Sequence, residues 1–204
     1  MNTQDRGPSI DRPRSRILSK HLLLVAMLLA GCATNRDTAT LAGRSGERGE
    51  EPTYWNDTRS GGEPHIVIDL EQQRASFYRG DKIVGISPVS TGREGHDTPL
   101  GEFRVTQKDP THVSSTYGDY VDRTGQVVRE NVDATKNLPP RGTVFRGAPM
   151  PYFLRIHGAI GMHAGYLPGY PASHGCIRLP KDMAIRFFQD APIGTPVAIR
   201  QESP

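Results

Sequence analysis

The stretch HIVIDL, at residues 65–70, decides the fold class of this chain. It is rich in β-branched residues, which favour the pleated, half-buried surface of a strand. Two similar runs follow: residues 75–78, after a polar turn around Gln72, and residues 82–89, which end at Ser-Thr-Gly (90–92). We therefore expect three consecutive short strands in this part of the chain.

The sequence outside this stretch has the same character. Seventeen prolines and twenty-two glycines interrupt its apolar runs, which favours short strands and turns over long helices. One helix is expected at 181–189, where apolar residues follow Pro180 at helical spacing. The prediction is a mostly β fold, a sandwich or barrel with a short helix near the C-terminus. Four further strands are expected at 101–106, 144–145, 152–157 and 196–200.

The segment 109–140 has no clear periodicity. A structureless stretch of this length in a compact domain is typical of a lid or binding loop. A hairpin with a weak sequence pattern is the alternative, and the sequence does not separate the two.

The N-terminus has the layout of a secretory signal. Basic residues from Arg12 to Lys20 precede an apolar run at 22–30, which ends in Gly31 and Cys32. The run is shorter than the roughly 20 residues that a membrane span needs. We therefore predict that residues 1–31 are a removable signal peptide.

The end of this run, LAGC at residues 29–32, resembles the lipobox of bacterial lipoproteins. The resemblance implies that Cys32 becomes the lipidated first residue, with enough acyl chains for a stable membrane anchor. Position 33 is Ala rather than Asp, which favours the inner leaflet of the outer membrane over the inner membrane. The expected location is the periplasm; the alternative is an ordinary signal peptide.

Residues 32–62 are predicted to be a flexible tether, because they are polar and almost without apolar clusters. Tyr54 and Trp55 are a candidate docking point within it. Residues 63–201 then form one domain of about 140 residues, enough for a real core.

The net charge of +3 gives no support to nucleic-acid binding. Residues 1–31 hold five basic and two acidic side chains, so the chain after the signal is close to neutral. A basic patch for nucleic acid is therefore not predicted.

The second of the two cysteines, Cys176, is the candidate nucleophile. With Cys32 lipidated, it is the unpaired thiol in an oxidising compartment. His174 lies two residues away on the same face of an extended chain, and His163 lies thirteen residues upstream. Either imidazole is a candidate for the base. Gly175 permits close approach of a substrate, so the amides of 174–176 are candidate oxyanion donors.

Three motifs together resemble the L,D-transpeptidase catalytic domain, or YkuD domain, over about residues 63–201. They are SHGCIRL at 173–179, GMHAG at 161–165 followed by Gly169 and Ala172, and STG at 90–92 with TPLGEF at 98–103. The last of these helps to frame the cleft in that family.

The resemblance implies a role for each matching residue. Cys176 is the nucleophile and His163 is the base, its ring held by backbone contacts. Ser173, His174 and Gly175 shape the oxyanion hole or contact substrate. Arg178 orders the loop or binds a substrate carboxylate. His96 and His157 lie outside the motifs and are expected to be structural or surface residues.

The resemblance also implies the reaction. Cys176 attacks the carbonyl of the L-centre at position three of a peptidoglycan stem peptide, and an amine resolves the thioester. That amine belongs to a second stem or to a lysine of an outer-membrane lipoprotein. No metal or cofactor is implied, and carbapenems are expected to acylate the thiol. The motif His163-Ala164-Gly165 departs from a common His-Gly-Thr-Asn version with a longer gap, which leaves the acceptor open.

Three alternatives remain at this point. His163, His174 and Cys176 are also zinc-ligand types, although a fourth ligand is not evident. A lipoprotein that only binds the cell wall is a second alternative. The third is a carboxypeptidase or endopeptidase, in which water resolves the thioester with the same residues.

Overall fold

The computed structural model describes residues 53–56 and 61–201. The predicted signal peptide, the lipidation site at Cys32 and most of the predicted tether lie outside the described residues. Within the described ranges, no helix is long and apolar enough to cross a membrane.

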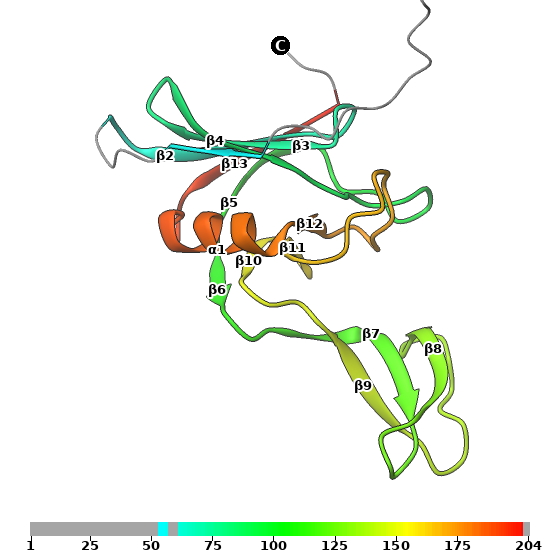
Figure 1. Ribbon diagram of the computed structural model, residues 1–204. Helices are drawn as coiled ribbons and strands as arrows, with labels where there is room; N and C mark the ends of the chain where they lie inside the picture. Colours follow the sequence, from blue (N-terminus) through cyan, green and yellow to red (C-terminus); the bar gives the residue numbers. More distant parts are fainter. Residues whose placement is uncertain (1–52, 57–60, 202–204) are drawn as a thin grey trace, which may run out of the picture. The chain divides into compact units, whose positions relative to one another are not determined.

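The largest sheet contains the three strands expected from the opening stretch and has the order β1-β4-β3-β2-β13-β5 (Figure 1). Neighbouring strands are antiparallel except β13 and β2, which are parallel. Its strands are β1 (Tyr54–Trp55), β2 (Pro64–Asp69), β3 (Arg74–Arg79), β4 (Lys82–Pro88), β5 (Gly101–Arg104) and β13 (Pro196–Arg200).

A second sheet, of order β12-β11-β10-β6, carries the motif residues. β11 and β12 are parallel, so that Met162 pairs with Ile177 and His163 pairs with Arg178. This register places the two halves of the sequence signature side by side. The strands are β6 (Gln107–Asp109), β10 (Phe153–His157), β11 (Ile160–Ala164) and β12 (Ile177–Leu179).

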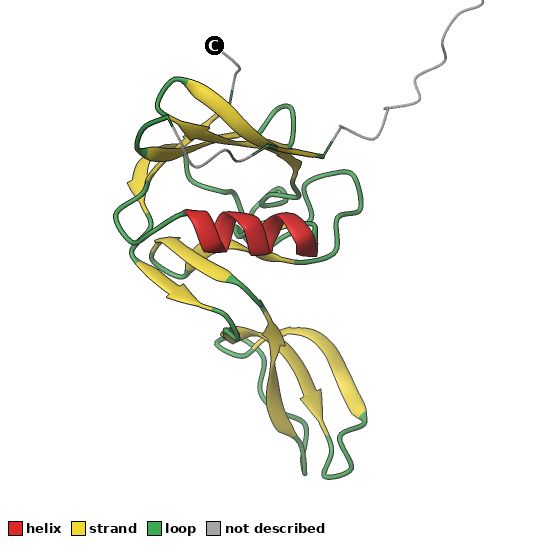
Figure 2. Ribbon diagram, turned by 60° about the vertical axis from the view of Figure 1, so that its left-hand side comes forward, coloured by secondary structure: helices red, strands yellow, loops and turns green. Residues whose placement is uncertain are grey.

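The core lies between the six-stranded sheet and a layer formed by the second sheet and α1 (Lys181–Asp190) (Figure 2). Phe77 of β3 and Phe187 of α1 meet edge to face at 5.3 Å between ring centroids. Trp55 packs against both rings, at 5.2 and 5.7 Å. The candidate docking point in the predicted tether is thus a strand of the large sheet, with its indole against the core.

The predicted class, mostly β with one helix near the C-terminus, is confirmed. The segment 109–140 is not a structureless loop: it contains the hairpin β7 (Val113–Val121) and β8 (Val127–Asp133). This hairpin and β9 (Val144–Pro149) form a third sheet, of order β8-β7-β9. β11 and β12 were not predicted, because their sequences are short and Gly- or Arg-containing rather than regularly β-branched.

Candidate active site

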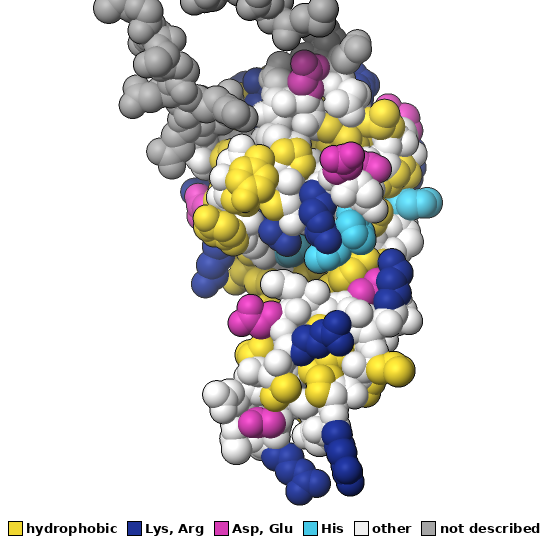
Figure 3. All heavy atoms as spheres, turned by 90° about the vertical axis from the view of Figure 1, so that its right-hand side faces the viewer, with side chains coloured by type: hydrophobic (Ala, Val, Ile, Leu, Met, Phe, Trp, Pro, Cys, Tyr) yellow, Lys and Arg dark blue, Asp and Glu magenta, His cyan; other side chains and the backbone are white. Residues whose placement is uncertain are grey.

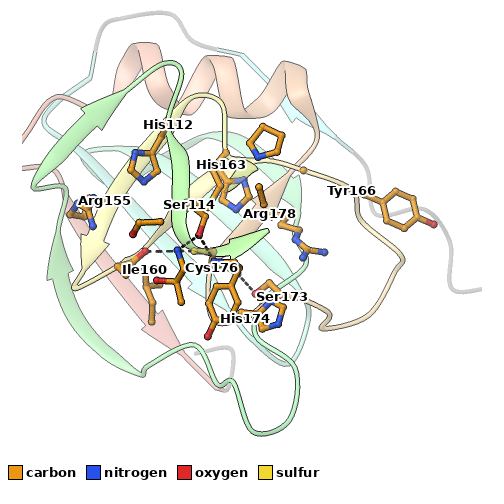
Figure 4. Close-up of a pocket in the computed structure, with 18 residues that line it drawn as sticks. His112, Ser114, Arg155, Ile160, His163, Tyr166, Ser173, His174, Cys176 and Arg178 are labelled. Atoms are coloured by element: carbon orange, nitrogen blue, oxygen red, sulfur yellow. Dashed lines mark hydrogen bonds between the residues drawn. The ribbon is translucent and has the colours of Figure 1, made fainter. Parts of the chain in front are cut away.

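One cleft of roughly 400 Å³ contains the candidate nucleophile and the candidate base (Figure 4). Cys176 comes directly before β12, and His163 lies on the neighbouring strand β11. The third sheet forms another part of the wall, through residues 114–117 of β7 and residues 148–149 of β9. The cleft therefore joins three elements that are far apart in the sequence.

The thiol of Cys176 is half-buried, and its Sγ faces the carbonyl oxygen of Ala159 at 3.8 Å. Burial raises the pKa of this thiol above its usual range, while a backbone hydrogen bond from Gly161 and the charge of Arg178 act in the opposite direction. Since burial dominates, Cys176 is a neutral thiol at neutral pH.

His163 is buried, and its ring is fixed by the backbone. Nδ1 lies 2.9 Å from the carbonyl oxygen of Ala164. A carbonyl can only accept, so Nδ1 carries the proton and Nε2 presents its lone pair. Burial lowers the pKa of His163 to about 4, the hydrogen bond to Ala164 opposing the shift. At neutral pH this imidazole is therefore uncharged and able to accept a proton.

His174 is differently placed. Its Nε2 lies 2.9 Å from Nη2 of Arg93, so Nε2 must accept a hydrogen bond from that guanidinium. The ring stacks on Tyr117 at 4.0 Å and meets the edge of His96 at 4.8 Å. Burial, and then the charge of Arg93, lower the pKa of His174 to about 4. The basic nitrogen of His174 is therefore already occupied, which leaves His163 as the available base.

The backbone before the thiol is held by Ser173. Its Oγ accepts from the amide of Gly175 at 3.0 Å and donates to the carbonyl of Cys176 at 2.5 Å. Gly175 has φ +105°, a conformation that disfavours any side chain. Of the three amides expected to face an oxyanion, that of Gly175 is thus engaged, and those of His174 and Cys176 remain.

The STG and TPLGEF blocks fix this loop from the other side. Ser90 and Arg178 exchange two backbone hydrogen bonds of 3.0 Å. The hydroxyl of Thr98 donates to the carbonyl of Gly175 at 2.8 Å and accepts from the amide of Gly92 at 2.9 Å. A Cβ at Gly92 would lie 2.0 Å from the carbonyl oxygen of His96, so only glycine fits there.

Sequence reasoning missed several residues of the cleft. His112 stacks on Phe153 at 4.2 Å, with Nδ1 3.1 Å from Asp109. Arg155, on β10, and Tyr117, on β7, also line the wall. None of these residues belongs to a local motif, and the sequence offers no signal that would have found them. Of the two histidines set aside, His157 packs against Phe103, and His96 supports His174.

Within the ranges that the structure describes, no three His, Cys, Asp or Glu side chains could together hold a metal ion. His163, His174 and Cys176 border the same cleft, but the nitrogen of His174 that would bind zinc is already hydrogen-bonded to Arg93.

Comparison with known proteins gives one family match. The family model for the L,D-transpeptidase catalytic domain, YkuD, matches residues 63–199. Bacillus subtilis YqjB, named as an L,D-transpeptidase, is 27% identical over 143 residues, which cover 70% of this chain and 74% of YqjB. Escherichia coli ErfK/SrfK, also named as an L,D-transpeptidase, is 27% identical over 140 residues, which cover 66% of this chain and 43% of that protein.

The fold is also found among solved structures. An L,D-transpeptidase from Mycobacterium smegmatis superimposes with a TM-score of 0.53 at 19% identity, over 69% of this chain and 59% of that one. At this identity the likeness concerns the fold alone. The chain spans less than half of ErfK/SrfK and about three fifths of the mycobacterial structure.

Proposed function

Since the chain belongs to the YkuD family of L,D-transpeptidase catalytic domains, we propose that it is an L,D-transpeptidase that acts on peptidoglycan stem peptides through a thioester on Cys176. One observation carries the proposal. Cys176 and His163 line one cleft, and the bond from His163 Nδ1 to Ala164 leaves Nε2 as a proton acceptor.

In the acylation step, His163 Nε2 takes the proton of the Cys176 thiol as Sγ attacks the carbonyl carbon of the L-centre at position three. The amides of His174 and Cys176 donate to the oxyanion, and Ser173 holds the loop that presents them. The carbon–nitrogen bond then breaks. The leaving amine takes the proton from His163, and the acyl group stays on sulfur.

In the second step, the amine of an acceptor attacks the thioester carbonyl and gives a proton to His163. The carbon–sulfur bond breaks, and the thiolate of Cys176 recovers the proton. Arg178, half-buried beside the thiol, is a cation suited to a substrate carboxylate. A second stem peptide or a lysine of a lipoprotein fits the acceptor role, and water in its place would make the enzyme a hydrolase.

The lipid anchor belongs to the same proposal. The lipobox resemblance at residues 29–32 supports attachment through Cys32, and Ala33 supports the outer membrane. A polar tether would let the domain reach peptidoglycan from the inner leaflet. The site of action is then the periplasm.

The full chain should give a covalent carbapenem adduct of one molecule per protein, measured by intact-mass spectrometry. Cys176→Ala should lose the adduct and lower muropeptide turnover on the order of a thousandfold or more, since nucleophile removal has effects of this size. Cys32→Ala is the matched control, because it removes the other cysteine. It should keep both the carbapenem adduct and the muropeptide turnover.

Mass spectrometry of the muropeptide products separates the outcomes. Crosslinked stems support transpeptidation, whereas tripeptides alone would identify a hydrolase. Unchanged turnover by Cys176→Ala would overturn the thioester mechanism. Binding of peptidoglycan without any turnover would favour the non-catalytic lipoprotein.

A further inference from the structure

The residues that line the cleft carry positive but no negative charge. Two arginines, Arg155 and Arg178, are among them, and no aspartate or glutamate is. On the face drawn in Figure 3, histidine and basic side chains adjoin one another, with acidic side chains next to them. Because a half-buried guanidinium with no carboxylate partner keeps its charge unneutralised, such a cleft suits an anionic ligand.

Arg155 is held in place by neutral partners only. Its Nε donates to Oε1 of Gln107 at 2.8 Å, and Nη1 donates to the carbonyl oxygen of Gly158 at 2.6 Å. The guanidinium also lies over the ring of Phe153, 5.2 Å from the centroid. These contacts fix the direction of the group without neutralising its charge, and Nη2 makes no bond in the described part of the chain.

The guanidinium of Arg178 is also without a carboxylate partner among the described residues. Its aliphatic stem packs over Gly165, where an added Cβ would lie 3.0 Å from Cγ. Its side chain makes no hydrogen bond or ion pair to any described residue. In Figure 4, Arg155 and Arg178 lie on opposite sides of Cys176. Burial raises the pKa of the Cys176 thiol, and the charges of Arg178 and Arg155 oppose that rise.

We propose that Arg155 is a specificity-determining residue that binds a substrate carboxylate across the thiol from Arg178. Together the two guanidiniums select a donor with carboxylates on both sides of the scissile amide. One belongs to the leaving terminal residue, and the other is on the side chain of the residue that is acylated. This inference rests on the proposed function, because it assigns the substrate of the same site.

Three synthetic donor peptides test the inference: one with both carboxylates free, one with the leaving-residue carboxylate amidated, and one with the side-chain carboxylate amidated. Arg155→Gln should raise KM for the free donor on the order of tenfold, since one charge-assisted hydrogen bond is lost. With one of the two amidated donors, the wild type and Arg155→Gln should have the same KM. The carboxylate that is amidated in that donor is the group that Arg155 binds. An equal penalty on all three donors would overturn the inference.

Arg104→Gln is the matched control. Arg104 also donates to a backbone carbonyl, that of Gly194 at 2.9 Å, but does not line the cleft. It should leave KM unchanged for every donor.

A second measurement does not need turnover. Iodoacetate and iodoacetamide alkylate the same thiolate and differ in charge, so the ratio of their rates at Cys176 cancels any change in thiol pKa. In the Cys32→Ala background, Arg155→Gln should lower the iodoacetate-to-iodoacetamide ratio about threefold, and Arg155→Lys should restore it. An unchanged ratio in Arg155→Gln would overturn the inference even if the enzyme is active. A lowered ratio in a protein without turnover would uphold the binding of an anion by Arg155 beside the thiol, while the proposed function fails and the donor assignment fails with it.

Discussion

Burial acts on Cys176 and His163 in the same sense, because it disfavours the charged form of each. It raises the pKa of the thiol and lowers that of the imidazole to about 4. The resting pair is therefore thiol and neutral imidazole rather than thiolate and imidazolium. The nucleophile has to be generated as it attacks, with the proton passing to Nε2 of His163.

This assignment predicts the pH dependence of thiol alkylation. In the Cys32→Ala background, the rate of Cys176 alkylation by iodoacetamide should keep rising with pH through neutrality and beyond the ordinary thiol range. It should show no plateau between pH 5 and pH 7, where an ion pair would already present a thiolate. Rates followed by mass spectrometry give the profile, and a plateau in that window would contradict the neutral pair.

Sequence reasoning at the residue scale worked where chemistry is local. In the run 173–179, Gly175 directly precedes Cys176, and glycine permits an unusual backbone turn at that position. The structure confirms the turn, because Gly175 has a φ of +105°. Proximity alone would have made His174 the base. Its hydrogen bond with Arg93 could not be predicted, since the two residues lie 81 positions apart.

Between elements, the link that matters is the contact of β7 with the catalytic loop. Tyr117 stacks on His174 at 4.0 Å with the ring planes 18° apart. The third sheet thereby covers the residue next to Gly175 and narrows the cleft. The contact with His174 is made by the ring of Tyr117 rather than by its hydroxyl.

Tyr117→Ala should lower kcat/KM about fivefold, because a lost aromatic pair is worth ~1 kcal/mol beyond area burial. Tyr117→Phe should keep nearly full activity, since the ring remains. Phe145→Ala on β9 is the control for general loosening of the third sheet, because Phe145 packs on Tyr120 and does not line the cleft. A larger loss in Phe145→Ala than in Tyr117→Ala, measured by steady-state kinetics, would show that the stack has no separate role.

The elements that sequence reasoning identified are those with regular apolar patterns. β13 has the bounds expected, and α1 extends the predicted helix by one residue, to Asp190. The hairpin β7–β8 confirms one of the two alternatives for residues 109–140. The sequence did not separate it from a structureless loop, because its strands are polar and largely exposed on one face, so that pairing rather than burial defines them. The parallel pair β11–β12 was not predicted, because its pairing joins residues some fifteen positions apart in the sequence.

Across the whole molecule, the same burial that prepares the site costs stability in acid. His163 is 6% exposed. In the folded chain its pKa is about 4, against an ordinary value of 6.5. Between these values the unfolded chain binds more protons than the folded chain, so the free energy of unfolding rises with pH. The contribution of neutral His163 to the free energy of unfolding is therefore fully present above about pH 6.5, and it is lost as the pH falls toward 4.

The loss should be about 3 kcal/mol between pH 7 and pH 4, because the pKa of His163 falls from 6.5 to about 4 on folding and one pKa unit corresponds to ~1.4 kcal/mol. Urea unfolding of the wild type and of His163→Asn at several pH values measures it. The side-chain amide nitrogen of asparagine takes the place of Nδ1 and can donate to the carbonyl of Ala164, but it does not titrate, so the stability of this variant should fall less steeply over this range. Because His174 and the carboxylates titrate alike in both proteins, the difference between the two slopes belongs to His163. Identical slopes would mean that His163 takes up its proton without leaving the folded site, and the neutral base inferred for catalysis would then lose its physical support.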